Sequence, residues 1–138
     1  MTVKENLIVQ KSFDFAVRIV NLYKFLCEKH KEYTLSKQLL RSGTSIGANV
    51  NEGTQGQSTR DFLSKMSIAL KEAAETQYWI KLLQKTEYLI EKQGGSILSD
   101  CNEILRILHS IVKTTKKSLV KQKRAKRKKL TKDSKMDN

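Results

Sequence analysis

Apolar residues recur at alternating spacings of four and three along much of this chain, and this pattern constrains the fold more than any other feature. Such spacing places the side chains on one face of an α-helix, where neighbouring helices pack together. The clearest example is the series Ile97, Cys101, Ile104, Leu108, Ile111 and Thr115. Proline, the commonest helix breaker, is absent. The chain is therefore predicted to be all-α.

Four periodic segments predict four helices joined by short polar or glycine-containing connections. We expect them over about 6–30, 35–52 and 59–90, with the fourth beginning after Gly94-Gly95. The chain shows no strand-like alternation, and its 138 residues are a usual size for one domain. The predicted architecture is an antiparallel, up-and-down four-helix bundle over residues 1–119, followed by a basic tail over residues 120–138.

The ends of the third helix are predicted from capping residues. Ser58 is expected to be the N-cap residue, and Gly94-Gly95 is expected to end the segment after about Ile90. Ser96 or Ser99 would then cap the fourth helix. The apolar seam predicted within the third helix comprises Phe62, Met66, Ala69, Ala73, Thr76, Ile80 and Leu83.

The second segment contains two glycines where a helix interior is expected. Each Gly costs a helix about 1 kcal/mol relative to Ala. Gly43 and Gly47 are four residues apart and share a face, so we expect a neighbouring helix to approach that face closely. The alternative is a loop with a short helix on either side, and the helix is the favoured interpretation.

The first segment has two adjacent apolar stripes, which is more than a simple surface helix needs. We expect this helix to pack on more than one neighbour, either within the chain or in another subunit. One stripe comprises Phe13, Ala16, Val17, Val20 and Cys27, and the other comprises Phe15, Ile19, Leu22 and Leu26.

Positive charge is concentrated at the C-terminus. The segment 113–138 holds 12 Lys and Arg against two Asp, which is +10 of the formal +13, whereas residues 1–112 carry 15 minus 12, or +3. Apart from Ala125, Leu130 and Met136, nothing after Val120 is apolar. We therefore expect at most a turn or two of helix there, disorder of the rest in isolation, and a polyanionic partner. The candidate phosphate-binding residues are Lys121, Lys123, Arg124, Lys126, Arg127, Lys128 and Lys129.

The sequence offers little catalytic chemistry, and we predict that the protein is not an enzyme and has no cofactor. It lacks a Walker loop, a dinucleotide-binding glycine pattern and an HExxH motif. His30 and His109 are isolated, and Ser45 has no base at a recognisable spacing. Glu72 and Glu75 lie one turn apart but lack the Glu-x-x-His pairs of bundle metal sites, so we interpret them as a surface pair or as partners for Arg41 or Lys71.

The two cysteines are expected to be inert thiols in the core. Cys27 and Cys101 both lie on apolar stripes, without a second Cys or His at ligand spacing. No segment approaches the roughly 18 apolar residues that span a bilayer. The N-terminal sequence lacks the apolar region and cleavage site of a secretory signal, so a cytoplasmic location in a bacterial-type cell is expected.

Two stretches resemble a known family. They are LLRSGTSIGANVNEG (Leu39–Gly53) and, after Arg60-Asp61-Phe62, SIALKEAAETQYWIKLL (Ser67–Leu83). These resemble the four helix bundle protein family, also called the intervening-sequence protein of 23S ribosomal RNA genes, and the resemblance extends over about residues 13–119. One departure is Gly47, where many members carry proline.

The resemblance implies an antiparallel four-helix protomer that assembles into a ring, commonly a homopentamer, without enzymatic activity or a cofactor. A related bundle is the nucleic-acid-binding accessory subunit of retroelement reverse transcriptases. The basic tail lies beyond the region that the family shares, so the resemblance implies no role for it.

Together these features favour a non-enzymatic, oligomeric nucleic-acid-binding protein, associated with RNA or the ribosome, and they favour RNA over DNA as its partner. The alternative is a protein–protein scaffold or an accessory subunit of a nucleic-acid enzyme, with Tyr78 and Trp79 at the interface. A membrane partner is not expected, because the tail lacks the apolar face of an interfacial helix. No small-molecule substrate is expected.

Overall fold

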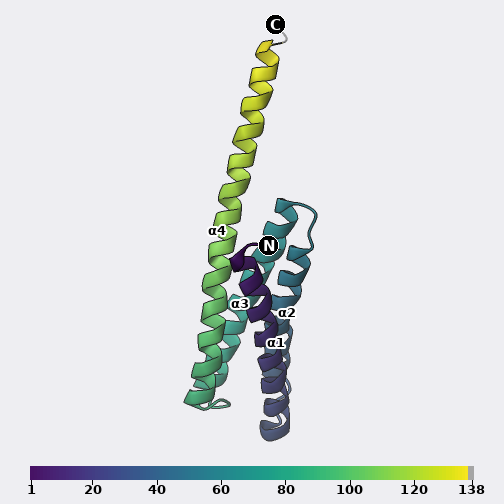
Figure 1. Cartoon of the computed structure of the whole chain (residues 1–138). Coiled ribbons are helices and arrows are strands. Elements are labelled where there is room, and N and C mark those ends of the chain that lie inside the picture. The colour runs from purple at the N-terminus through teal and green to yellow at the C-terminus, as the bar shows by residue number, and fades with distance from the viewer. Residues whose placement is uncertain (137–138) are drawn as a thin grey trace.

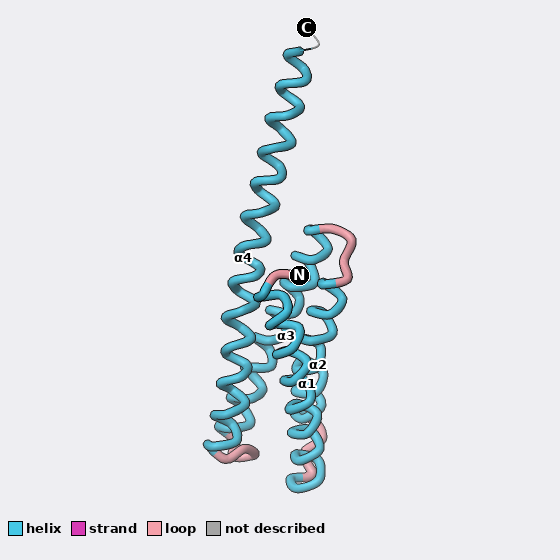
Figure 2. The backbone as a smooth tube through the Cα atoms, viewed as in Figure 1, coloured by secondary structure: helices cyan, strands magenta, loops and turns pink. Residues whose placement is uncertain are grey.

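The computed structural model describes residues 1–136, which form four α-helices and no strand (Figure 2). This confirms the prediction of an all-helical chain with four helices. The helices are α1 (Val3–His30), α2 (Leu35–Thr54), α3 (Thr59–Lys85) and α4 (Glu91–Met136).

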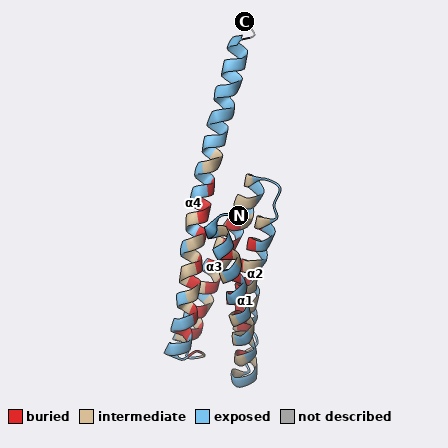
Figure 3. Cartoon of the chain, viewed as in Figure 1, coloured by how far each residue is buried: buried red, intermediate tan, exposed pale blue. Residues whose placement is uncertain are grey.

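The four helices pack around one apolar core, and we call residues 1–119, which enclose it, the body. α1 contacts α2 and α4, and α3 also contacts α2 and α4, so the core is enclosed on all sides (Figure 1). Figure 3 shows the buried residues on the inner faces of this body, whereas the far part of α4 is exposed. The largest fully buried side chains are Phe15, Ile8, Ile19, Leu26, Leu39, Ile46, Met66, Ile80, Leu83, Ile104, Leu108 and Val50.

The seams predicted for α3 and α4 face this core. Every member of the α4 series is buried, and so is every member of the α3 series except Phe62, which is half-buried. The predicted N-cap of α3 is also confirmed, because the Ser58 hydroxyl accepts a hydrogen bond from the Asp61 backbone N–H at 3.1 Å. The alternating spacing therefore identified the buried face of both helices.

α2 is one uninterrupted helix, so the loop alternative is wrong, and its glycines allow close helix packing. A Cβ atom at Gly43 would lie 2.7 Å from Cγ1 of Ile19 on α1. A Cβ atom at Gly47 would lie 3.2 Å from the backbone oxygen of Ser12. Both contacts confirm the expected close approach of a neighbouring helix, which here is α1.

Glu32 caps the start of α2, although it was not recognised in the sequence. Its carboxylate accepts hydrogen bonds from the backbone N–H groups of Thr34, Leu35 and Ser36 at 3.0, 2.9 and 2.7 Å. Burial acts to raise the pKa of Glu32, but these backbone bonds outweigh it and hold the pKa below its ordinary value. The N-terminus of α2 is thus satisfied by a charged side chain from the preceding connection.

The connection between α3 and α4 differs from the sequence prediction. α3 ends at Lys85 rather than near Ile90, and Glu87 adopts a left-handed conformation with φ of 68°. The backbone N–H groups of Tyr88 and Leu89 both donate to the carbonyl of Leu83. Leu89 is 3% exposed, so it anchors the turn in the core.

As a result, α4 begins at Glu91, and Gly94-Gly95 lies inside the helix instead of ending a segment. The predicted caps at Ser96 and Ser99 are therefore wrong. Gly94 is buried against the side chain of Gln84, which leaves no room for a Cβ atom. Gly94 consequently serves helix packing rather than chain reversal.

α4 also continues as a helix to Met136, which corrects the expectation of disorder after Val120. All residues from Val120 to Met136 are exposed, so tertiary burial does not explain this part of the helix. Two local factors explain why this part is helical. The segment lacks Gly and Pro and is rich in Lys and Arg, which favour helix. The buried part of α4 also supplies a formed helix, so continuation needs no new nucleation.

We predict that Gly43→Ala destabilises the protein. Helix propensity alone would stabilise α2 by about 1 kcal/mol, but the added methyl group would collide with the buried Ile19 side chain. Overpacking of a core typically costs about 1–3 kcal/mol, so a net loss in the free energy of unfolding is expected. Urea denaturation followed by circular dichroism measures this change.

Gly95→Ala is the matched control. Gly95 lies inside α4, and nothing surrounds the position of its missing Cβ atom within 4 Å. We expect this variant to gain up to about 1 kcal/mol. Equal stabilisation by both substitutions would show that α1 and α2 do not approach closely at Gly43.

Glu32→Ala is predicted to lower the free energy of unfolding by about 1 kcal/mol near neutral pH, because α2 loses its cap. The pKa of Glu32 is lower in the folded than in the unfolded state, so its stabilisation is present above the unfolded pKa. It is lost as the pH falls through the folded pKa. Urea denaturation near pH 7 and near pH 3 should therefore show a smaller difference from wild type at the lower pH.

Glu28→Ala provides the comparison, because Glu28 is an exposed glutamate one turn earlier on α1. We expect its free energy of unfolding to stay within about 0.5 kcal/mol of wild type at both pH values. A Glu32→Ala defect that persists unchanged at low pH would contradict a role for the ionised carboxylate.

Candidate nucleic-acid interface

The candidate interface is residues 120–136 of α4, which we call the extension. All seven predicted phosphate-binding residues, from Lys121 to Lys129, lie on this helix and are exposed. Their side chains are therefore accessible, although the sequence analysis placed them in an unfolded tail. The same helix carries five further exposed cations that were not among the predicted phosphate-binding residues. They are Lys132 and Lys135 within the extension and Lys113, Lys116 and Lys117 just before it.

The extension projects from one end of the body. Figure 1 shows α4 continuing past the ends of the other three helices. At 1.5 Å per residue, the extension is about 25 Å long. Its cations are therefore presented to solvent on every side, away from the acidic residues of the body.

Within the part of the chain that the structure describes, the ion pairs all join residues of the body. They link Lys11 to Glu103, Arg18 to Asp100, Arg41 to Glu72 and Glu75, and Lys65 to Glu52. The described extension has a single acidic residue, Asp133, among nine Lys and Arg residues. The positive charge of the extension is therefore left for an external anion to neutralise.

Like charges also follow one another along the extension at helix-contact spacings. Arg124, Lys128 and Lys132 are each four residues apart, so their side chains are neighbours on the helix surface. Each such pair destabilises an exposed helix by about 0.2–0.5 kcal/mol. A bound polyanion would remove this repulsion.

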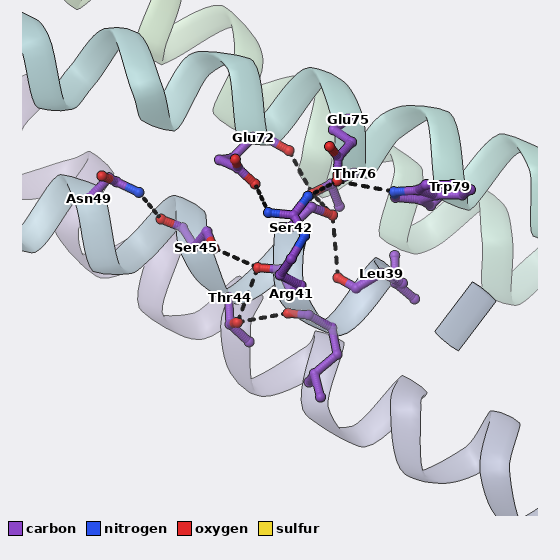
Figure 4. A network of polar contacts seen from close by, with 11 residues as sticks. Leu39, Arg41, Ser42, Thr44, Ser45, Asn49, Glu72, Glu75, Thr76 and Trp79 are labelled. Atoms are coloured by element: carbon purple, nitrogen blue, oxygen red, sulfur yellow. Dashed lines mark hydrogen bonds and ion pairs between the residues drawn. The ribbon is translucent and has the colours of Figure 1, made fainter. Parts of the chain in front are cut away.

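Glu72 and Glu75, interpreted from the sequence as a surface pair or as partners for Arg41 or Lys71, lie in a polar cluster between α2 and α3, which Figure 4 shows from close by. Arg41 Nη1 lies 3.2 Å from Glu72 Oε2, and the Arg41 guanidinium also pairs with Glu75. The Trp79 indole N–H donates to the same Glu75 carboxylate at 3.2 Å. This confirms the interpretation of the two glutamates as partners for Arg41.

The hydroxyl groups in this cluster are used within the fold. The Ser42 and Thr76 hydroxyls lie 2.9 Å apart in the buried contact between α2 and α3. Ser45 donates to the backbone oxygen of Arg41, and Asn49 donates to that of Ser45 (Figure 4). The polar, glycine-containing segment of α2 is thus accounted for by helix packing and internal hydrogen bonds.

The remaining candidates for chemistry have structural surroundings. The His30 ring makes edge-on contacts with Phe25 and Tyr88, with ring centroids 5.5 and 5.6 Å apart. Burial raises the pKa of the Cys101 thiol to about 12, so this thiol remains protonated at neutral pH. Cys27 is half-buried on α1.

Two further kinds of site are absent from residues 1–136. No group of three or more His, Cys, Asp or Glu residues is placed to hold a metal ion. No helix there has an apolar stretch long enough to cross a bilayer.

Comparison with known proteins identifies relatives of the body. The sequence pattern of the family described as "23S rRNA-intervening sequence protein" matches residues 4–110. A solved structure of similar fold is the crystal structure of a protein of unknown function from the S23 ribosomal protein family of Bacteroides thetaiotaomicron. It is 57% identical to this chain, with a TM-score of 0.79, and the match covers 80% of this chain and 99% of that one. No curated protein matches.

The family match stops short of the candidate interface. It ends at residue 110, before the extension begins. The likeness therefore describes the body, and the properties of the extension have to be argued from its own residues.

Proposed function

This chain belongs to the 23S rRNA-intervening sequence protein family, and we propose that it is a non-enzymatic protein that binds nucleic acid, RNA in particular, through its basic extension. The observation that carries the proposal is an exposed helix of nine cations and one acid, none of the cations paired within the described chain. The description of the family refers to 23S rRNA and names no reaction, which supports RNA as the polyanion and a binding role.

The arrangement that we propose for the body is an antiparallel, up-and-down four-helix bundle over residues 1–119. The contacts between α1 and α4 support it, because Lys4 lies against Ser110 whereas Arg18, further along α1, lies against the earlier residue Asp100. Likewise, Arg41 of α2 pairs with Glu72 of α3, whereas Glu52, further along α2, pairs with the earlier residue Lys65. The bundle then acts as a rigid base for the extension.

Phosphate groups are the contacts that the proposed cations would make. Lys121, Lys123, Arg124, Lys126, Arg127, Lys128 and Lys129 provide charge but no built pocket in which a base edge could be read. Contacts to phosphates fix position without reading sequence, so binding is expected to depend on salt and to vary little with base sequence.

We predict that the full chain binds RNA in a strongly salt-dependent way and that a chain ending at Leu119 does not. If six to ten cations meet phosphates, the affinity should fall about 10³–10⁵-fold between 50 and 200 mM salt. Electrophoretic mobility shifts at several salt concentrations measure this. Equal binding by the two chains would exclude the extension as the RNA-binding element.

The shortened chain needs its own control, because loss of binding has to be separated from loss of folding. Residues 120–136 are exposed throughout, so their removal should leave the melting temperature of the body unchanged. Helical ellipticity should fall, since a helical segment is lost. Circular dichroism measures both quantities on the same samples.

We also propose that the body self-associates, and that a ring, commonly a pentamer in proteins that this chain resembles, presents several extensions together. Support comes from α1, where Phe13 is 66% and Val17 is 48% exposed. Beside Phe13, a groove of about 450 Å³ runs between α1 and α2, lined in part by Val9, Ala16 and Ala48. Large exposed apolar residues beside a groove are typical of interaction surfaces, and several linked extensions would increase avidity.

Phe13→Asp is predicted to reduce the molar mass of the particle in solution towards that of a single chain, because a charge would be buried at the subunit contact. Size-exclusion chromatography with light scattering measures the mass. Tyr33→Asp is the control, since Tyr33 is 52% exposed in the connection between α1 and α2. A wild-type protein that elutes as a monomer would contradict self-association.

A further inference from the structure

The cations of the extension surround the helix instead of occupying one face. Successive residues of an α-helix are rotated by about 100°. On this geometry, Lys121, Arg124 and Lys128 lie on one side, whereas Lys123, Lys126 and Arg127 lie on roughly the opposite side. Lys132 lies on the first side, and Lys129 lies between the two sides. No side of the helix between residues 121 and 132 is without a positive charge.

Such an arrangement differs from that of a helix that binds a flat or one-sided partner. A helix on an anionic membrane separates a cationic face from an apolar face that enters the membrane, and a helix along one strand needs cations on the contacting side alone. In the extension, Leu130 is the single large apolar residue between Lys121 and Asp133, and it is 62% exposed. The charge distribution instead fits a partner whose negative charges approach from more than one side.

Single strands are usually held by aromatic side chains on which successive bases stack, in addition to a cationic groove. The described part of the extension contains no Phe, Tyr or Trp. It also has no concave surface, because it is one isolated helix (Figure 1). The features that favour single-stranded nucleic acid are thus missing from it.

From these observations, and building on the proposed nucleic-acid binding, we propose that the extension lies in a groove of double-stranded nucleic acid and contacts phosphates of both strands at once. Two backbones that flank a helix would present negative charge to opposite sides of it. An α-helix with its side chains is about 10–12 Å wide, and the B-form major groove is about 12 Å wide. The major groove of A-form RNA is narrower, so the width match favours a DNA duplex whereas the family description favours RNA, and the two duplexes are tested separately.

The test compares two triple variants of the full-length protein that remove equal charge from opposite sides of the helix. The first is Lys121→Gln, Arg124→Gln and Lys128→Gln, and the second is Lys123→Gln, Lys126→Gln and Arg127→Gln. Each variant loses two lysines and one arginine, and glutamine has a helix propensity similar to theirs. Circular dichroism verifies that the extension stays helical in both.

Affinity is measured for an RNA duplex, a DNA duplex and the corresponding single strands over a range of salt concentrations. We expect at least one duplex to bind about tenfold or more tightly than its single strands. Both triple variants should weaken duplex binding to a similar extent. Each should also reduce the slope of log affinity against log salt by about three, which is roughly one per lost phosphate contact.

Two outcomes would overturn this inference while leaving the proposed function intact. One is equal affinity for duplexes and single strands. The other is a triple variant that binds duplex like the wild type, because the phosphates would then lie on one side of the helix. Failure of all probes to bind in dilute salt would instead contradict the proposed function itself.

Discussion

The extension depends on the burial of the preceding part of the same helix. Ile104, Leu108 and Ile111 of α4 are buried in the core of the body, and each such side chain contributes about 1.5–3 kcal/mol. This burial fixes the backbone of α4 up to Thr115. Residues beyond that point add to an existing helix, so they avoid the unfavourable nucleation that an isolated basic peptide would face. The core of the body therefore determines the conformation of a segment that it does not contact.

The same continuity links the charge of the extension to its stability as a helix. Neighbouring lysines and arginines on successive turns repel one another, and the described extension offers only Asp133 as a counter-charge. A polyanion that neutralises these cations removes the repulsion, so binding and helix formation favour each other. Within the body, by contrast, ion pairs already match cations such as Arg41 with carboxylates. Unmatched charge is thus concentrated where no packing role competes with binding.

Much of the body could be predicted because its rules are local and periodic. The four-three spacing identified the buried faces of α3 and α4, and the pair Gly43 and Gly47 predicted close contact with another helix. The end of α3 could not be predicted in this way. It depends on Glu87, a non-glycine residue in a left-handed conformation, and on the burial of Leu89, which only the assembled core shows. The cap of α2 by Glu32 was not predicted either, because glutamate is not a typical N-cap residue.

Disorder was wrongly predicted for the extension because composition describes what a segment can bury and does not take account of the helix to which the segment is joined. This difference has consequences for recognition. A disordered tail would have to be ordered on binding, and the loss of conformational entropy would reduce its affinity. In a helix, that cost is met before the partner arrives, and the positions of Lys121, Lys123 and their neighbours around the axis are fixed relative to one another. A preformed rod with charge on all sides can discriminate between partners by the spatial arrangement of their phosphates, whereas a flexible tail would follow any of them. Its shape, in addition to its charge, is therefore what makes a duplex the partner to test.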